Sequence, residues 1–381
     1  MTVIRPRPPT DPLDLEVAGT PWEPGLSADL LDRARAAVLR SPAELDLARA
    51  MLSEYDTRRP ESRLFAVFHA ASRIRAAVDR VIVVTAGGIG PATRLVAAAC
   101  CHPCHDQLPR GDRGGRPKLS WLDGRSSPDE LQGLLDLVAP PGRPLGRDLL
   151  DRWTILAADA PSDDRGNLAV VRLLLHARAA AVDGPGPPPL VAITEAGTGL
   201  DRLAATTAGA ERFAGGAAID SPLGLFTEAG LLPAAIAGVD VVQLLKGAAA
   251  MLVRFAEAPA AANPVLADAA ASLAAAAMGR PARRFAVDDR CLESLAPWHR
   301  WLRPSGLADA GFVTRIAGGA ARRARPSDPA SAELVSEITE PPAEPAAITI
   351  RLPRIDEHSV GQLLQLLALS AAVEEHLRRG V

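Results

Sequence analysis

Apolar runs alternate with amphipathic stretches along much of the chain, and this pattern predicts strands and helices in turn. Continuous apolar runs at 81–84 and 190–194, each followed by turn residues, are typical of strands buried on both faces. Leucine and alanine recur at helical spacing twice within 27–55 and again over 65–78 and 166–181. Because strands alternate with helices, the pattern predicts an α/β fold with a mainly parallel sheet.

The same pattern predicts further elements towards both ends. Helices are expected over 91–100, 131–137, 200–209 and from Val360 to about Leu377, and strands over 152–160, 283–289 and 348–352. Residues 1 to about 25 are rich in proline and charge, so we expect a loose arm there. Residues 326–345 are expected to form a surface connection around a short helix.

Length and charge limit the classes of function. A chain of 381 residues suits two α/β domains, and its hydrophobic fraction of 48% supports sizeable cores. The net charge of −3 and the absence of a polybasic block argue against nucleic-acid and membrane partners. The N-terminus has no continuous apolar leader, and the four cysteines form no disulfide framework. We therefore expect a cytoplasmic protein with reduced thiols.

One cysteine-rich segment has the spacing of a cofactor site. The sequence CHPCH at 101–105 satisfies the pattern for covalent haem attachment, but haem attachment needs an exported chain. A zinc site built from Cys101, Cys104 and His105 lacks a fourth ligand at normal spacing. We interpret the segment as structural and expect neither a cofactor nor a metal.

Six segments occur in the order found in one enzyme family. They are DRVIVVTAGGIGPATRLVAAACCHPCHDQLPRGDRGGRPKL, LVAITEAGTGLDRLA, GLLPAAIAGVDVVQLLKGAAAM, NPVLADAAA, DDRCLESLAPWHRWL and IRLPRIDEHSVGQLLQLLALSAAVEEHL. Over about 60–377 the chain thereby resembles glucose-6-phosphate isomerase. The resemblance implies two three-layer αβα domains of the sugar-isomerase (SIS) type. We expect an N-terminal arm with helices over 1–60, a first domain over 61–212 and a second over 213–381.

That family interconverts glucose 6-phosphate and fructose 6-phosphate in glycolysis and gluconeogenesis. The resemblance implies that two loops hold the phosphate. The first loop here contains Gly87 and Gly88 but lacks the family's serine. The second contains Ser162, but it has three carboxylates in the six residues from Asp159 to Asp164, which would repel a phosphate. We expect Asp163 or Asp164 to cap a helix instead.

The family's chemistry needs a base, an oxyanion stabiliser and a histidine for ring opening. By resemblance, the arginine position falls on Pro222, the glutamate position on Ser305 and the histidine position on Ala330. A proline has neither a charge nor an N–H donor. The family's C-terminal segment, with its catalytic lysine, is also expected to be missing after Val381.

These replacements predict an isomerase-like protein whose activity is weak or absent. A second hypothesis is a non-catalytic regulatory or scaffolding partner of an active paralogue, as a homodimer or heterodimer. A third is an enzyme of altered mechanism that uses Glu195 or Asp309 and binds a ligand other than a sugar phosphate. Glu195 follows a buried strand, and strand C-termini line the crevices of open α/β sheets.

Overall fold

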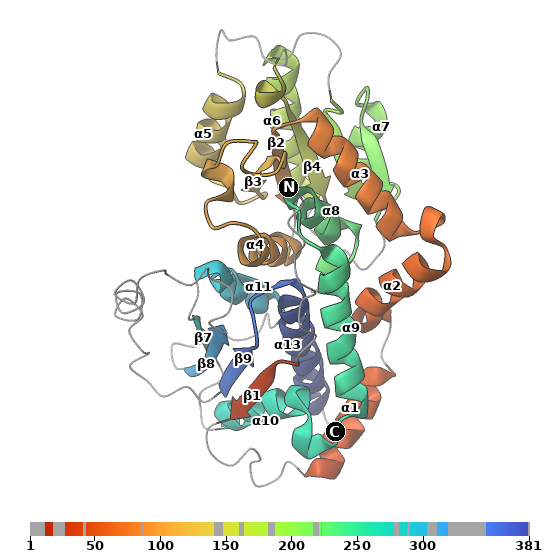
Figure 1. The fold of residues 1–381 in the computed structure, drawn as a ribbon, viewed down its shortest axis with the longest axis vertical. Helices are drawn as coiled ribbons and strands as arrows, with labels where there is room; N and C mark the ends of the chain where they lie inside the picture. Colours follow the sequence, from red (N-terminus) through yellow and green to blue (C-terminus); the bar gives the residue numbers. More distant parts are fainter. Residues whose placement is uncertain are drawn as a thin grey trace. The chain divides into compact units, whose positions relative to one another are not determined.

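Two separate β-sheets organise the chain (Figure 1). Contacts divide it into two units, one formed by Ala50–Val241 and the other by Met1–Arg49 together with Val242–Val381. This division places residues 213–241 with the first sheet, whereas the sequence-based expectation assigned them to the second domain. The structure is a computed structural model, and it describes residues 12–17, 27–40, 43–85, 87–140, 148–159, 164–181, 187–215, 221, 223–277, 282–287, 290–302, 311–318 and 348–379.

The unit Ala50–Val241 contains a five-stranded sheet in the order β3-β2-β4-β5-β6. Its strands are all parallel: β2 (Arg80–Thr85), β3 (Lys118–Leu122), β4 (Trp153–Ala158), β5 (Leu190–Thr194) and β6 (Glu211–Ala214). The chain moves outward from β2 to β3 and then returns to the other side of β2 with β4. The strand order therefore reverses between β2 and β4, and ligands of open parallel sheets bind at the carboxyl ends of the strands at such a point.

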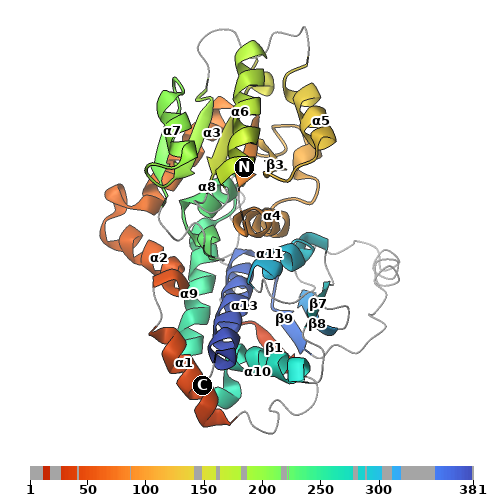
Figure 2. The same ribbon diagram turned by 180° about the vertical axis from the view of Figure 1, so that it is seen from behind.

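Helices cover both faces of this sheet, so the unit has three layers (Figures 1 and 2). On one face lie α5 (Pro128–Val138), α6 (Asp164–Ala181) and α7 (Gly199–Thr206), whose apolar residues share a core with β2, β4 and β5. The other layer contains α3 (Arg63–Ala77), α4 (Ile89–Cys100) and α8 (Glu228–Ala237), and α8 contacts both α3 and α4. A short helix, α2 (Leu47–Thr57), precedes this layer.

The other unit contains a four-stranded sheet in the order β1-β9-β8-β7. The strands β7 (Ala282–Val287), β8 (Gly311–Gly318) and β9 (Ile348–Leu352) are parallel, and β1 (Asp14–Val17) joins β9 antiparallel. Its helices are α1 (Ala28–Leu39), α9 (Val241–Glu257), α10 (Pro264–Ala277), α11 (Leu295–Leu302) and α13 (Glu357–Arg378). The helix α13 contacts α1, α10 and α11.

The predicted α/β class is confirmed, and every helix and strand predicted within the described residues is present within a few residues of its expected bounds. One prediction is wrong: residues 14–17, expected in a loose arm, form the edge strand β1. The arm is held there because the backbone of Leu13 bonds to Gln362 and to Arg254. Strands β3, β6 and β8 were not predicted. Residues 326–345 lie outside the described part of the chain.

No helix within the described ranges is both long and apolar enough to cross a lipid bilayer.

Candidate functional site at the carboxyl edge of the five-stranded sheet

The predicted glycine loop lies at the point where the strand order reverses. It follows β2, and Gly87 has a φ of 62°, a left-handed conformation that favours glycine. Gly88 then forms the N-cap of α4. A Cβ atom on Gly90 would lie 2.6 Å from Oγ1 of Thr85, so a side chain there would be too close to the end of β2. These glycines allow the backbone to turn tightly from the strand into the helix.

The N-terminus of α4 has no side-chain cap. In contrast, Ser62 caps α3, Thr198 caps α7 and Thr227 caps α8. Within the described residues, the N–H groups of Gly88, Ile89 and Gly90 have no hydrogen-bond acceptor in the protein. Free N–H groups and the positive end of the helix dipole favour an anion at this position.

Helices α3, α4 and α8 all begin at this same edge. Arg63 at the start of α3 lies 3.9 Å from the Glu228 carboxylate at the start of α8, and Nε of Arg75 near the end of α3 donates to the Ile236 carbonyl near the end of α8. The helices α3 and α8 therefore run in the same direction. At the other end of α4, Sγ of Cys101 lies 3.6 Å from the Ala237 carbonyl oxygen.

The cluster at the start of α3 and α8 combines two carboxylates with one guanidinium. Glu54 accepts bonds from the backbone N–H of Arg63 at 2.9 Å and from its Nε at 2.7 Å. Burial raises the pKa of Glu228, and the Coulomb attraction of Arg63 only partly opposes this effect. Arg63 is thus engaged mainly by Glu54. Glu228 is only 4% exposed, and its carboxyl group favours the protonated form more than an ordinary glutamate does.

At the end of β4, the edge is rich in hydrogen-bond acceptors. Asp159 is buried, and its Oδ1 accepts a bond of 3.3 Å from Nδ2 of Asn167 in the first turn of α6. The Oδ1 atom of Asn167 is also buried and makes no hydrogen bond. A Cβ atom on Gly124, after β3, would lie 2.8 Å from Cα of Gly166, so this loop packs directly against the start of α6.

The loop after β5 satisfies its own polar groups. Oγ1 of Thr198 lies 2.6 Å from Oγ1 of Thr194 and caps α7 by accepting a bond from the N–H of Asp201. Asp201 in turn accepts a bond from the N–H of Gly197. Glu195 belongs to this loop and is half-buried. Hydrogen bonds within the loop therefore stabilise it. The catalytic role suggested for Glu195 stays a prediction.

Several predicted site residues lie outside the described part of the chain: Ser162, Asp163, Pro222, Ser305, Asp309 and Ala330. Of the predicted residues, the structure describes Gly87, Gly88 and Glu195 and places them at one sheet edge. Asp164 begins α6. Sequence reasoning missed Arg63 and Glu228. The sequence did contain a signal for them. Ser62 and Thr227 are typical helix-capping residues, and Arg63 and Glu228 follow them directly at the start of apolar helices.

The cysteine-rich segment makes protein contacts. Besides the contact of Cys101 with Ala237, Nε2 of His105 lies 3.1 Å from the Pro117 carbonyl oxygen. In the residues that the structure describes, no three His, Cys, Asp or Glu side chains gather as metal ligands.

Known proteins resemble this chain in both sequence and fold. No family model matches it. It is 28% identical to a glucose-6-phosphate isomerase of Symbiobacterium thermophilum over 61% of this chain and 50% of that protein. It is 29% identical to that of Rubrobacter xylanophilus over 66% of this chain and 56% of that protein. The chain thus spans about half the length of the curated relatives it matches.

Solved structures share the fold. A glucose-6-phosphate isomerase from Chlamydia trachomatis aligns with a TM-score of 0.65 and 11% identity, covering 92% of this chain and 79% of that chain. A hypothetical protein from Thermus thermophilus aligns with a TM-score of 0.65 and 18% identity, covering 92% of this chain and 89% of that chain. At these identities the alignments establish the fold alone.

Proposed function

Because the chain is a glucose-6-phosphate-isomerase-like protein with a sugar-isomerase fold, we propose that it binds a sugar phosphate and isomerises it weakly or not at all. The binding site of this proposal is the carboxyl edge of the five-stranded sheet, at the reversal between β2 and β4. The relatives named glucose-6-phosphate isomerase suggest the class of ligand. The expected replacements at catalytic positions suggest the loss of turnover.

One observation supports the proposed binding of a sugar phosphate most directly. The N–H groups of Gly88, Ile89 and Gly90 point from an uncapped helix start and have no acceptor among the described residues. A phosphate placed there would accept hydrogen bonds from the backbone and gain from the helix dipole. No cationic side chain is needed for this mode of binding.

The proposed loss of catalysis rests on the residues that stand at the positions implied for the family's catalytic groups. Enediolate formation needs a base near the substrate carbon and a charge stabiliser near its oxygen. Pro222, Ser305 and Ala330 occupy the positions implied for the arginine, the glutamate and the histidine. Arg63 is no ready substitute for the family's arginine, because its Nε already donates a bond of 2.7 Å to the Glu54 carboxylate.

A Gly88→Asp substitution tests the binding half. It puts a carboxylate at the uncapped start of α4, where it would compete with phosphate for the same N–H groups. We expect glucose 6-phosphate to raise the Tm of the unmodified protein and the Kd to increase at least about tenfold in the variant. Gly133→Asp, which adds the same charge on the exposed side of α5, is the control and should leave the Kd unchanged.

Glucose 6-phosphate turnover tests the other half. We expect a rate far below the range of about 1–1,000 per second that is common for enzymes. A rate within that range would contradict the loss of catalysis. A Tm unmoved by millimolar glucose 6-phosphate, or equal shifts with Gly88→Asp, would contradict binding at α4.

A further inference from the structure

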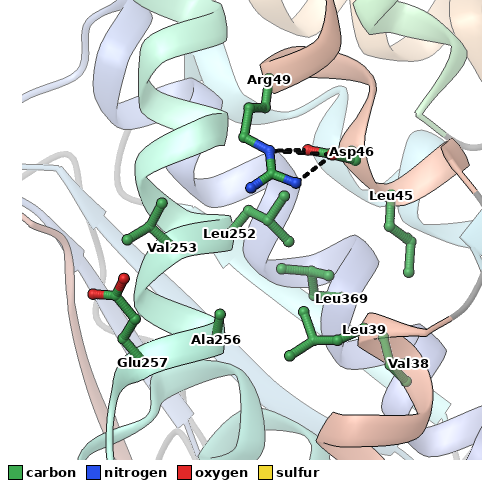
Figure 3. A pocket seen from close by; sticks show the side chains of 10 residues that line it. All are labelled: Val38, Leu39, Leu45, Asp46, Arg49, Leu252, Val253, Ala256, Glu257 and Leu369. Atoms are coloured by element: carbon green, nitrogen blue, oxygen red, sulfur yellow. Dashed lines mark hydrogen bonds and ion pairs between the residues drawn. The ribbon is translucent and has the colours of Figure 1, made fainter.

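A pocket of about 240 Å³ lies in the unit that contains the four-stranded sheet (Figure 3). Residues of α1, α2, α9 and α13, together with the turn before α2, line it. Seven of the ten lining residues are apolar: Val38, Leu39, Leu45, Leu252, Val253, Ala256 and Leu369. Leu369 and Leu252 are buried, whereas Leu39 and Val253 are each 43% exposed. The pocket thus has an apolar base with exposed apolar side chains beside it.

The remaining three lining residues are charged: Asp46, Arg49 and Glu257. Asp46 holds Arg49 by bonds of 2.8 and 3.1 Å from Nε and 2.6 Å from Nη2. Figure 3 shows Asp46 and Arg49 together on one side of the pocket, and Glu257 on α9 far from this pair. Within the described residues, Glu257 has no ion pair. The lining therefore has one carboxylate that no cation neutralises.

The C-terminus of α9 adds to this negative potential. Glu257 is the last residue of α9, and the carbonyl groups at the end of a helix carry partial negative charge. The nearby Arg35 donates to the Ala258 carbonyl oxygen at 2.7 Å, but its own charge is balanced by Asp32 at 2.8 Å. An anionic ligand would be repelled from this position, and a cation would be attracted.

We propose that this pocket binds a small apolar ammonium ligand, with its hydrocarbon body against the exposed Val253 and Ala256 and its charged nitrogen beside Glu257. The size of the pocket agrees with such a ligand: an apolar cavity of roughly 150 Å³ admits benzene, and drug-sized ligands occupy roughly 300 Å³ or more. The pocket lies in a different unit from the proposed sugar-phosphate edge, so the two proposals stand independently.

Three probes of similar size and different charge test the proposal at pH 7: 2-phenylethylamine, 2-phenylethanol and 3-phenylpropanoate. NMR titration of the full chain should give a Kd for the amine about two- to fivefold lower than for the alcohol, because an exposed ion pair contributes little. The carboxylate should bind most weakly. Glu257→Gln should abolish the difference between amine and alcohol, and the matched exposed change Glu130→Gln should not.

A second variant keeps the test sharp. Ala256 is exposed at the pocket, so Ala256→Phe should fill the space without disturbing the core and weaken binding of all three probes about tenfold or more. Equal affinities for amine and alcohol would overturn the role of Glu257. Binding unchanged by Ala256→Phe, or no saturable binding of the amine, would overturn the site itself.

Discussion

Glu228 shows how a single buried carboxyl couples the stability of the protein to pH. Burial raises its pKa, and Arg63 lies 3.9 Å away, beyond hydrogen-bond distance. The folded state therefore holds the proton more tightly than the unfolded chain does. The contribution of this group to stability is full below its unfolded pKa and is lost as the pH rises through the raised folded value.

Substitution of Glu228 by Gln should remove this pH dependence. Glutamine is neutral at every pH, so the variant should match the unmodified protein near pH 4 and have a higher Tm at pH 8. For a unit of this size each kcal/mol corresponds to about 2–4 °C. Thermal melting at the two pH values measures the difference, with the exposed Glu130→Gln as control. A variant less stable at pH 8 would show that the attraction to Arg63 outweighs the cost of burial.

Predictability from sequence differs among the residues of the candidate site. The glycine loop could be predicted, because a buried strand, two glycines and a helix follow one another directly in the chain. The cluster of Glu54, Arg63 and Glu228 could not, because all five strands of the sheet separate α3 from α8 in the sequence. The capping residues Ser62 and Thr227 mark the two helix starts in the sequence, but no local pattern indicates that these two starts lie together.

Among the elements, α9 and α13 approach each other through glycines. A Cβ atom on Gly247 of α9 would overlap the His358 carbonyl oxygen, and one on Gly361 of α13 would overlap the Leu244 carbonyl oxygen. Neither glycine has a positive φ, so the requirement is for space rather than for an unusual backbone conformation. The two helix backbones can be this close only if both positions lack a side chain.

Alanine at these positions should therefore destabilise the protein. We expect Gly247→Ala and Gly361→Ala each to lower the free energy of unfolding by about 1–3 kcal/mol, as overpacking of a core does. Gly133→Ala is the matched control, because that glycine lies in α5 with open space around it. This substitution should raise the free energy of unfolding by about 0.5–1 kcal/mol. Urea denaturation measures all three. A stabilising effect at Gly247 or Gly361 would show that the helices can separate at little cost.

Two of the strands that the sequence failed to predict, β1 and β6, share a physical cause. Strands β2 and β5 are buried on both faces, so they appear as continuous apolar runs. Strands β1 and β6 are four residues each and lie at sheet edges, and β6 alternates half-buried and exposed residues. Such short segments have little apolar pattern of their own. Their conformation depends on a neighbouring strand that is distant in sequence.

At the scale of the whole molecule, the two units differ in how many segments of the chain form them. The unit Ala50–Val241 is one continuous segment, and the other unit combines the first and last parts of the chain. A continuous unit with its own core satisfies the usual conditions for independent folding.

A polypeptide of residues 50–241 should therefore fold alone. We expect cooperative thermal unfolding by circular dichroism and dispersed amide signals by NMR, because the five-stranded sheet and both helical layers are contained within it. A matched polypeptide of residues 242–381 should fold poorly, since it lacks β1 and α1. Broad, non-cooperative melting of residues 50–241 would contradict the division into units.

The pairing of β1 with β9 also has a consequence for biosynthesis. A ribosome delivers the N-terminal part of the chain first, so β1 emerges long before Ile348–Leu352 has been translated. The intervening unit can mature in the meantime. During that interval the backbone groups of β1 that later bond to β9 must be solvated by water or shielded by a chaperone.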